Sequence, residues 1–130
     1  MKVCKICGKT EEQIVMQSHH VVSRKQQPAL INCKLNQVWL CIDCHTAGPN
    51  AVHNGGFLEL KKLRLELQKE YYKIFKEEFY SKEIIKDILE IKQNEVDRLL
   101  KTLKTKDGLY EKEDVIRACM GGKLMLDITI

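Results

Sequence analysis

Four of the six cysteines form two pairs with the spacing Cys-x-x-Cys: Cys4 with Cys7, and Cys41 with Cys44. Two intervening residues let both thiolates of a tight turn reach one ion, and two such turns supply the four sulfur ligands of a structural zinc. Thirty-three residues separate the two pairs, more than the roughly 15–20 of a plain zinc ribbon. We therefore expect a folded segment between the pairs, with zinc holding its two ends together.

The alternative roles for these cysteines are disulfides or a redox dithiol. The N-terminus begins Met-Lys-Val-Cys without the apolar stretch of a secretory signal. The chain also has no apolar run near the roughly 20 residues that span a bilayer. We expect a cytoplasmic protein without membrane association, whose paired thiols are reduced and bind metal. Cys33 and Cys119 have no such partner and are expected to be small buried hydrophobic residues.

All four histidines fall between residues 19 and 53: His19, His20, His45 and His53. A lone histidine is more often structural, but four in so short a stretch indicate metal or proton chemistry. Adjacent side chains on an extended strand point to opposite faces. His19 and His20 therefore cannot both bind one ion from a straight strand, which favours one as a ligand and the other as a base.

The order Cys-x-x-Cys, His-His, Asn, Cys-x-x-Cys-His, His resembles the HNH endonuclease family, over about residues 1–56. Members from phage and mobile elements often carry both cysteine pairs. The resemblance implies an α+β fold, in which a zinc-stabilised ββα-metal module holds one divalent ion between a β-hairpin and a helix. It also implies that the protein hydrolyses phosphodiester bonds of DNA, in a bacterial host or a phage-infected cell.

The resemblance further implies roles for single residues. His19, His45 and His53 would bind the catalytic cation, His20 would be the general base, and Asn36 would orient the loop of the catalytic histidine. An imidazole with a pKa of about 6.5 can accept a proton from water at cytosolic pH. The cation would stabilise the scissile phosphate and the departing 3′ oxygen, leaving 5′-phosphate and 3′-hydroxyl ends. Imidazole ligands do not decide between Mg²⁺, Mn²⁺, Ni²⁺ and Zn²⁺.

His53 departs from the family pattern. The second ligand often follows the first by one helical turn, but seven residues with a Gly48-Pro49 step separate His45 from His53. That step breaks a helix, so the two imidazoles could converge only across a loop. The alternative is that His53 caps or packs against the start of the following helix.

Two further features of the front segment have open interpretations. Arg24 and Lys25 are expected near the tip of the hairpin, either as a clamp on a DNA phosphate or as an ordinary solvated turn. Trp39 is expected in the core beneath the zinc rather than as a base-stacking platform.

The elements that must position these residues follow from a change in composition near residue 56. We predict an HNH nuclease module over 1–56 and a mainly α-helical region over 57–130. Apolar residues at three- and four-residue steps predict a helix over 57–79. A second helix is predicted from an N-cap at Ser81 to about 107. A short helix over 114–119 and a β-like segment over 123–130 complete the prediction.

The charge pattern allows a nucleic-acid partner without requiring one. The net charge is +4, and residues 1–56 hold six basic residues against three acidic ones, which permits phosphate contact. The helical region could pack on the module, or its leucine- and isoleucine-rich stripes could form a homodimer.

Two other functions compete with the nuclease. One is a non-catalytic zinc-containing module that binds nucleic acid, which would be expected to have lost the base or a ligand. The other is a protein-interaction module whose histidines bind a second zinc, which would hold both ions tightly and cleave no DNA.

Overall fold

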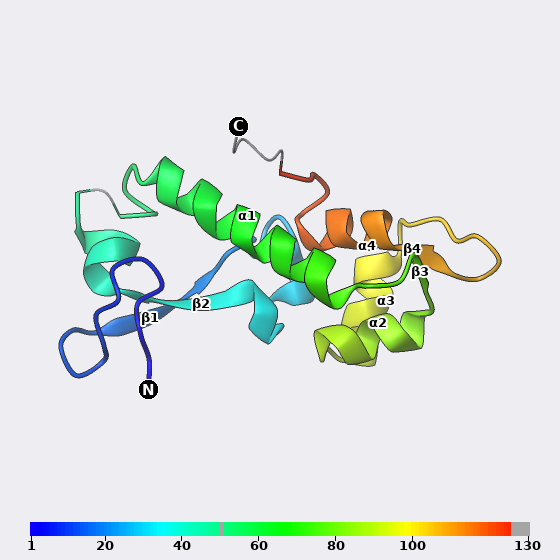
Figure 1. Ribbon diagram of the computed structural model, residues 1–130, viewed down its shortest axis with the longest axis horizontal. Helices are drawn as coiled ribbons and strands as arrows, with labels where there is room; N and C mark the ends of the chain where they lie inside the picture. The colour runs from blue at the N-terminus through cyan, green and yellow to red at the C-terminus, as the bar shows by residue number, and fades with distance from the viewer. Residues whose placement is uncertain (50, 126–130) are drawn as a thin grey trace. The chain divides into compact units, whose positions relative to one another are not determined.

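The protein is a small α+β molecule with a four-cysteine cluster, as predicted. A computed structural model describes residues 1–49 and 51–125 (Figure 1). In chain order the principal elements are β1 (Met16–His20), β2 (Gln37–Cys41), the π-helical turn η3 (Asp43–Ala47), α1 (Phe57–Ile74), β3 (Phe79–Tyr80), α2 (Lys82–Leu89), α3 (Gln93–Leu100), β4 (Tyr110–Glu111) and α4 (Lys112–Cys119). None of the described helices is long and apolar enough to cross a membrane.

The chain forms two compact units, and neither is continuous in sequence. The first, here the hairpin unit, comprises residues 1–21 and 37–63. The second, here the helical unit, comprises residues 22–36 and the chain from residue 64 onward. The boundary predicted at residue 56 lies inside the hairpin unit, and most of the connection between β1 and β2 belongs with the helices.

In the hairpin unit, β1 and β2 pair in antiparallel fashion, with Ser18 opposite Trp39 and His20 opposite Gln37. Side chains alternate between the two faces of such a ribbon. One face carries Gln17 and His19 of β1 with Val38 and Leu40 of β2. His19 and Leu40 are buried there. The other face carries Met16, Ser18, His20, Gln37, Trp39 and Cys41. It is more open except at Cys41, which is buried.

The prediction that Trp39 is a core residue is wrong. Its side chain is 39% exposed, and the Lys2 ammonium lies 4.3 Å from the centroid of the ring. The pairing register explains the difference, because it turns Leu40, the next residue of β2, into the core in its place.

The helical unit has an aliphatic and aromatic core of its own. Its largest fully buried side chains are Val22, Leu30, Tyr71, Phe75, Ile85, Leu89, Val96, Leu100, Val115 and Ile116. The prediction that Cys33 and Cys119 are buried free thiols is confirmed. The Cys33 thiol donates a hydrogen bond to the Leu89 carbonyl, at 3.4 Å. Leu30 and Cys33 come from the connection after β1, so this segment is part of the same core.

The helices agree with the predictions except at two points. Helix α1 begins where predicted but ends at Ile74, five residues before the predicted end at Phe79, which lies in β3. Ser81 caps α2, and α4 covers the predicted short helix. The predicted single helix from Ser81 to about 107 is wrong, since α2 ends at Leu89 and α3 begins at Gln93. Residues 123–125 form no strand, and the rest of the predicted terminal β segment lies outside the described residues.

The break between α2 and α3 has a local cause. Glu90 adopts a left-handed backbone with φ of 52°, a conformation in which a helix commonly ends. The Glu95 carboxylate then accepts a hydrogen bond from the Lys92 amide, at 2.8 Å, and satisfies a free donor at the start of α3.

Candidate metal centres

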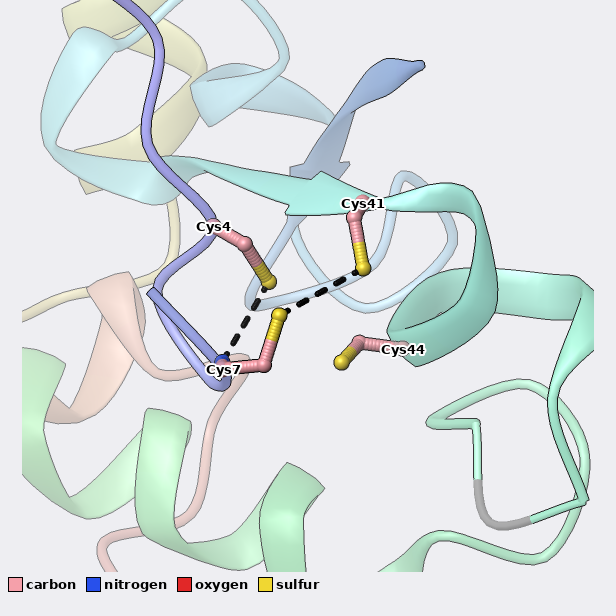
Figure 2. A group of neighbouring side chains, drawn as sticks. All are labelled: Cys4, Cys7, Cys41 and Cys44. Atoms are coloured by element: carbon pink, nitrogen blue, oxygen red, sulfur yellow. Dashed lines mark hydrogen bonds between the residues drawn. The ribbon is translucent and has the colours of Figure 1, made fainter. Parts of the chain in front are cut away.

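The four paired cysteines converge on one point. Figure 2 shows their sulfur atoms turned toward one another from the N-terminal turn and from the end of β2. All four lie within 4.8 Å of one another, and the sulfurs of Cys7 and Cys41 are 3.7 Å apart. A tetrahedral zinc with Zn–S bonds of about 2.3 Å requires sulfur separations of about 3.8 Å. The four thiols could therefore hold a metal ion and are compatible with a structural zinc.

The first pair lies in a turn that suits thiolate ligands. The Gly8 amide donates to the Cys4 carbonyl at 2.9 Å, and Gly8 has φ of +79°, which favours glycine. The Cys7 amide donates to the Cys4 sulfur at 3.5 Å. Burial raises the pKa of the Cys4 thiol, but hydrogen bonds from the backbone of Cys7, Cys41 and Ile6 outweigh burial and lower it to about 6. Cys4 is therefore largely a thiolate at neutral pH, the form that binds metal.

The second pair is joined to the hairpin. Cys41 is the last residue of β2, and Cys44 lies in η3. The Lys5 amide donates to the Trp39 carbonyl at 2.9 Å, which ties the turn of the first pair to β2. An ion on the four sulfurs would thus join the N-terminal turn, β2 and η3.

Three histidines form a second cluster in the same unit. A ring nitrogen from each of His19, His45 and His53 lies within 4.8 Å of the other two. The ring centroids are separated by 4.6 to 5.1 Å. His19 comes from β1, His45 from η3, and His53 from the loop before α1. His19 is buried and His53 is exposed, so a cation on these nitrogens would be open to solvent on the His53 side.

A loop, rather than a helical turn, brings His53 to His45. The Gly48 amide donates to the Asp43 carbonyl at 2.9 Å and closes the π-turn. The amides of Val52 and His53 then donate to the carbonyls of Cys44 and His45, at 2.9 and 3.1 Å. A Cβ atom at position 48 would lie 2.3 Å from the Asp43 oxygen, so the turn requires glycine there.

Gln17 is a site residue that the sequence reasoning missed. Its side-chain oxygen lies 2.7 Å from Nδ1 of His45, and it shares a face of β1 with His19. An amide oxygen can only accept, so Nδ1 carries the proton and Nε2 presents its lone pair. Burial, and then the charge of His53, lower the pKa of His45, which keeps the ring neutral at neutral pH. One signal in the sequence could have indicated Gln17. It lies two positions before His19, and residues two apart on a strand share a face.

Replacing Gln17 should weaken the histidine site without emptying it. Outer hydrogen bonds to a ligating imidazole are typically worth 10- to 100-fold in metal affinity, and we expect about 10-fold for Gln17→Ala. Gln17→Glu should restore the affinity, because a carboxylate accepts the same proton. Titration calorimetry with Ni²⁺ on zinc-loaded protein measures this, with Gln37→Ala on the opposite face as the control. Wild-type affinity in Gln17→Ala would remove Gln17 from the site.

His20 and Asn36 lie outside the three-histidine cluster. His20 is half-buried on the other face of β1, as expected from the alternation of a strand. Asn36 is buried, and its amide oxygen accepts from the Val22 amide at 2.8 Å. Its amide nitrogen donates to the carbonyls of Val22 and Leu30, at 2.9 and 3.3 Å. Asn36 thus closes the connection two residues after His20.

Arg24 and Lys25 are exposed in a turn of the same connection. This placement suits a phosphate clamp and a solvated turn equally well. Comparisons of the chain with protein-family models, with curated proteins and with solved structures found no match. The function is therefore argued from the chemistry of the two clusters.

Proposed function

We propose that this protein is a metal-dependent endonuclease of the HNH type that hydrolyses phosphodiester bonds of DNA. The observation that carries the proposal is the convergence of His19, His45 and His53, with a fourth histidine, His20, adjacent to the first of them. Three neutral imidazoles can hold a divalent cation and leave coordination positions for substrate oxygens. The imidazole donors leave the identity of the cation open, and Mg²⁺, Mn²⁺, Ni²⁺ and Zn²⁺ are the candidates.

The two faces of β1 support a division of roles. His19 would contribute to the cation site from the buried face, and His20, on the more open face, would carry out the proton transfer. In the proposed reaction His20 accepts the proton of a water molecule as the water oxygen attacks phosphorus. The bound cation would supply charge stabilisation for the scissile phosphate and the 3′ leaving oxygen.

Asn36 acts in this proposal as a positioning residue. Its amide is bonded to both backbone groups of Val22, so the chain leaving β1 after His20 has few alternative paths. Pre-organised side chains are a general requirement for catalysis. The burial of all these amide bonds strengthens the restraint, because a buried polar group is costly to leave unpaired.

A non-catalytic zinc-containing module is the second candidate. The observation in its favour is that the second cluster contains three imidazoles and no carboxylate, a donor set that also suits a tightly held zinc. Such a module would bind nucleic acid or a protein, and would not cleave DNA with any cation.

Conversion of supercoiled plasmid to nicked circles, with each cation in turn, tests the nuclease. Loss of a general base typically costs 10²- to 10⁴-fold, and we expect a loss in that range for His20→Ala. Metal content should be unchanged, because His20 is outside both clusters. Ser18→Ala, two residues earlier on the same face, is the matched control and should cut normally. Equal cleavage by wild type and His20→Ala would indicate a contaminating nuclease, and absence of cleavage with every cation would favour the second candidate.

A further inference from the structure

The open face of the hairpin presents the only tryptophan of the chain. Trp39 is 39% exposed, although tryptophan side chains are highly buried on average. One cation already lies against the ring, since the Lys2 ammonium is 4.3 Å from its centroid. The register explains how the ring is held on this face.

Trp39 has polar and apolar neighbours on this face: Met16 and His20 are diagonal to it across the ribbon, and Cys41 follows it on β2. Its partner across the ribbon is Ser18, whose hydroxyl donates to the Gln37 side-chain oxygen at 3.4 Å. A protein-binding patch would have an apolar core around the aromatic ring. An exposed aromatic ring with a lysine beside it, as Trp39 has in Lys2, is a combination that binds single-stranded nucleic acid.

The general base of the proposed reaction lies on the same face. His20 pairs with Gln37 and Trp39 pairs with Ser18, so His20 and Trp39 are diagonal neighbours on the ribbon. Such neighbours are about 7–8 Å apart, a distance that one nucleotide of an extended strand can bridge. A phosphate positioned at His20 would therefore place an adjacent base within reach of the indole.

We propose that Trp39 stacks on an unpaired base of the nucleic-acid substrate next to the scissile phosphate, and that Lys2 contacts the adjoining phosphate. This inference rests on the proposed nuclease function and narrows its substrate class. Within a duplex the faces of each base are covered by its neighbours and only the edges are exposed in the grooves. The substrate is therefore DNA with unpaired bases at the cleavage point, as in a flap, gap or bulge.

The platform is anchored by the four-cysteine site. Lys2 precedes Cys4 by two residues, and the Lys5 amide is bonded to the Trp39 carbonyl. Both groups that would contact the substrate are thus fixed to the turn of the first cysteine pair. A rigid platform loses little conformational entropy when a base stacks on it.

Because the chain has one tryptophan, its fluorescence reports directly on the platform. The experiment uses the full-length, zinc-loaded His20→Ala protein, in which cleavage does not compete with binding. A single-stranded DNA 12-mer and a blunt duplex hairpin of the same base composition are the two ligands. We expect the single strand to quench the tryptophan emission and the duplex to leave it nearly unchanged.

Affinity is measured in parallel by anisotropy of a labelled oligonucleotide. Stacking of one base on an aromatic side chain is worth roughly 5- to 100-fold by alanine substitution. We expect Trp39→Ala to lose about 10-fold for the single strand, and Trp39→Phe to retain most of the affinity. Lys2→Ala should reduce the salt dependence of binding by about one phosphate contact. Lys9→Ala, an exposed lysine of the same turn, is the matched control.

Unchanged emission on binding, or wild-type affinity in Trp39→Ala with intact zinc content, would overturn the platform and leave the nuclease proposal untouched. Equal quenching by duplex and single strand would overturn the assignment of the substrate class. Plasmid cleavage is scored separately, so that failure of the nuclease is seen as absence of cutting with every cation, whatever the fluorescence shows.

Discussion

Removing the ion from the four-cysteine site is expected to unfold the hairpin unit. The change to make is Cys41→Ser, because Cys41 is buried at the end of β2 and its sulfur is 3.7 Å from that of Cys7. Zinc binding contributes about 10–16 kcal/mol in small zinc-stabilised peptides at neutral pH. Burying an aliphatic side chain contributes only about 1.5–3 kcal/mol, and this unit has few of them. An ion at this site is therefore expected to be the largest single contribution to the stability of the unit.

Two measurements report the unfolding. Zinc content per chain should fall by one equivalent, and the emission of Trp39 should shift to that of a solvent-exposed indole. The far-ultraviolet circular dichroism of α2, α3 and α4 should persist, because their core is formed by residues of the helical unit. Cys33→Ala is the matched control, since Cys33 is a buried thiol outside the cluster, and it should keep its zinc. A Cys41→Ser protein that retains a full equivalent at this site and the native emission would contradict a structural role.

The second large effect is expected at the histidine cluster. Under the proposed nuclease function, His53→Ala should remove the cation from the histidine site and lower DNA cleavage by at least 10²-fold, because charge stabilisation by the cation is worth several kcal/mol. His53 is exposed on a loop, so its replacement costs little packing and separates ligation from folding. Mn²⁺ and Ni²⁺ titrations of the zinc-loaded protein measure the loss directly.

Thr46→Ala provides the control for that experiment. Thr46 is exposed in η3, immediately after His45, and should bind the cation and cut DNA as the wild type does. If His53→Ala bound the cation as tightly as the wild type, His53 would not be a ligand. The remaining interpretation would then be the one in which it packs before α1.

The sequence was sufficient to predict the cysteine cluster. Two pairs at Cys-x-x-Cys spacing have one common use in a reducing environment, and the chemistry of zinc leaves little freedom in how the pairs are arranged. The convergence of His45 and His53 was harder to predict from the sequence, because the Gly48-Pro49 step breaks a helix and allowed only a loop between them. The π-turn and the antiparallel return of the chain solve this problem through backbone hydrogen bonds that leave no pattern in the sequence.

Other features depended on long-range contacts. The pairing register of β1 and β2 decides which of Trp39 and Leu40 is buried. A shift of this register by one residue would exchange the two faces of the ribbon. The connection between β1 and β2 joins the helical unit partly through the Gln27 side chain, which donates to the Ala118 carbonyl at 2.7 Å. These residues are 91 positions apart, so no local pattern relates them.

The break between α2 and α3 was missed for a different reason. No glycine or proline marks it, and its cap residue is Lys92, which is not among the residues that usually cap helices. The apolar stripe continues through Ile88 and Ile91, so periodicity alone favours one long helix. A left-handed glutamate is uncommon enough that sequence reasoning does not expect one at Glu90.

The turn η3 gives the two ion sites a common piece of backbone, since adjacent residues in it, Cys44 and His45, belong to different clusters. Ordering of this turn by zinc therefore also sets the position of an imidazole of the other site. We therefore expect binding of the two ions to be thermodynamically linked. Such linkage is reciprocal, so each ion should raise the affinity for the other by the same factor. Cation affinities measured with and without zinc would give this factor. A cell that limits zinc would then lower cation occupancy at the histidines without any change in the concentration of the cation itself.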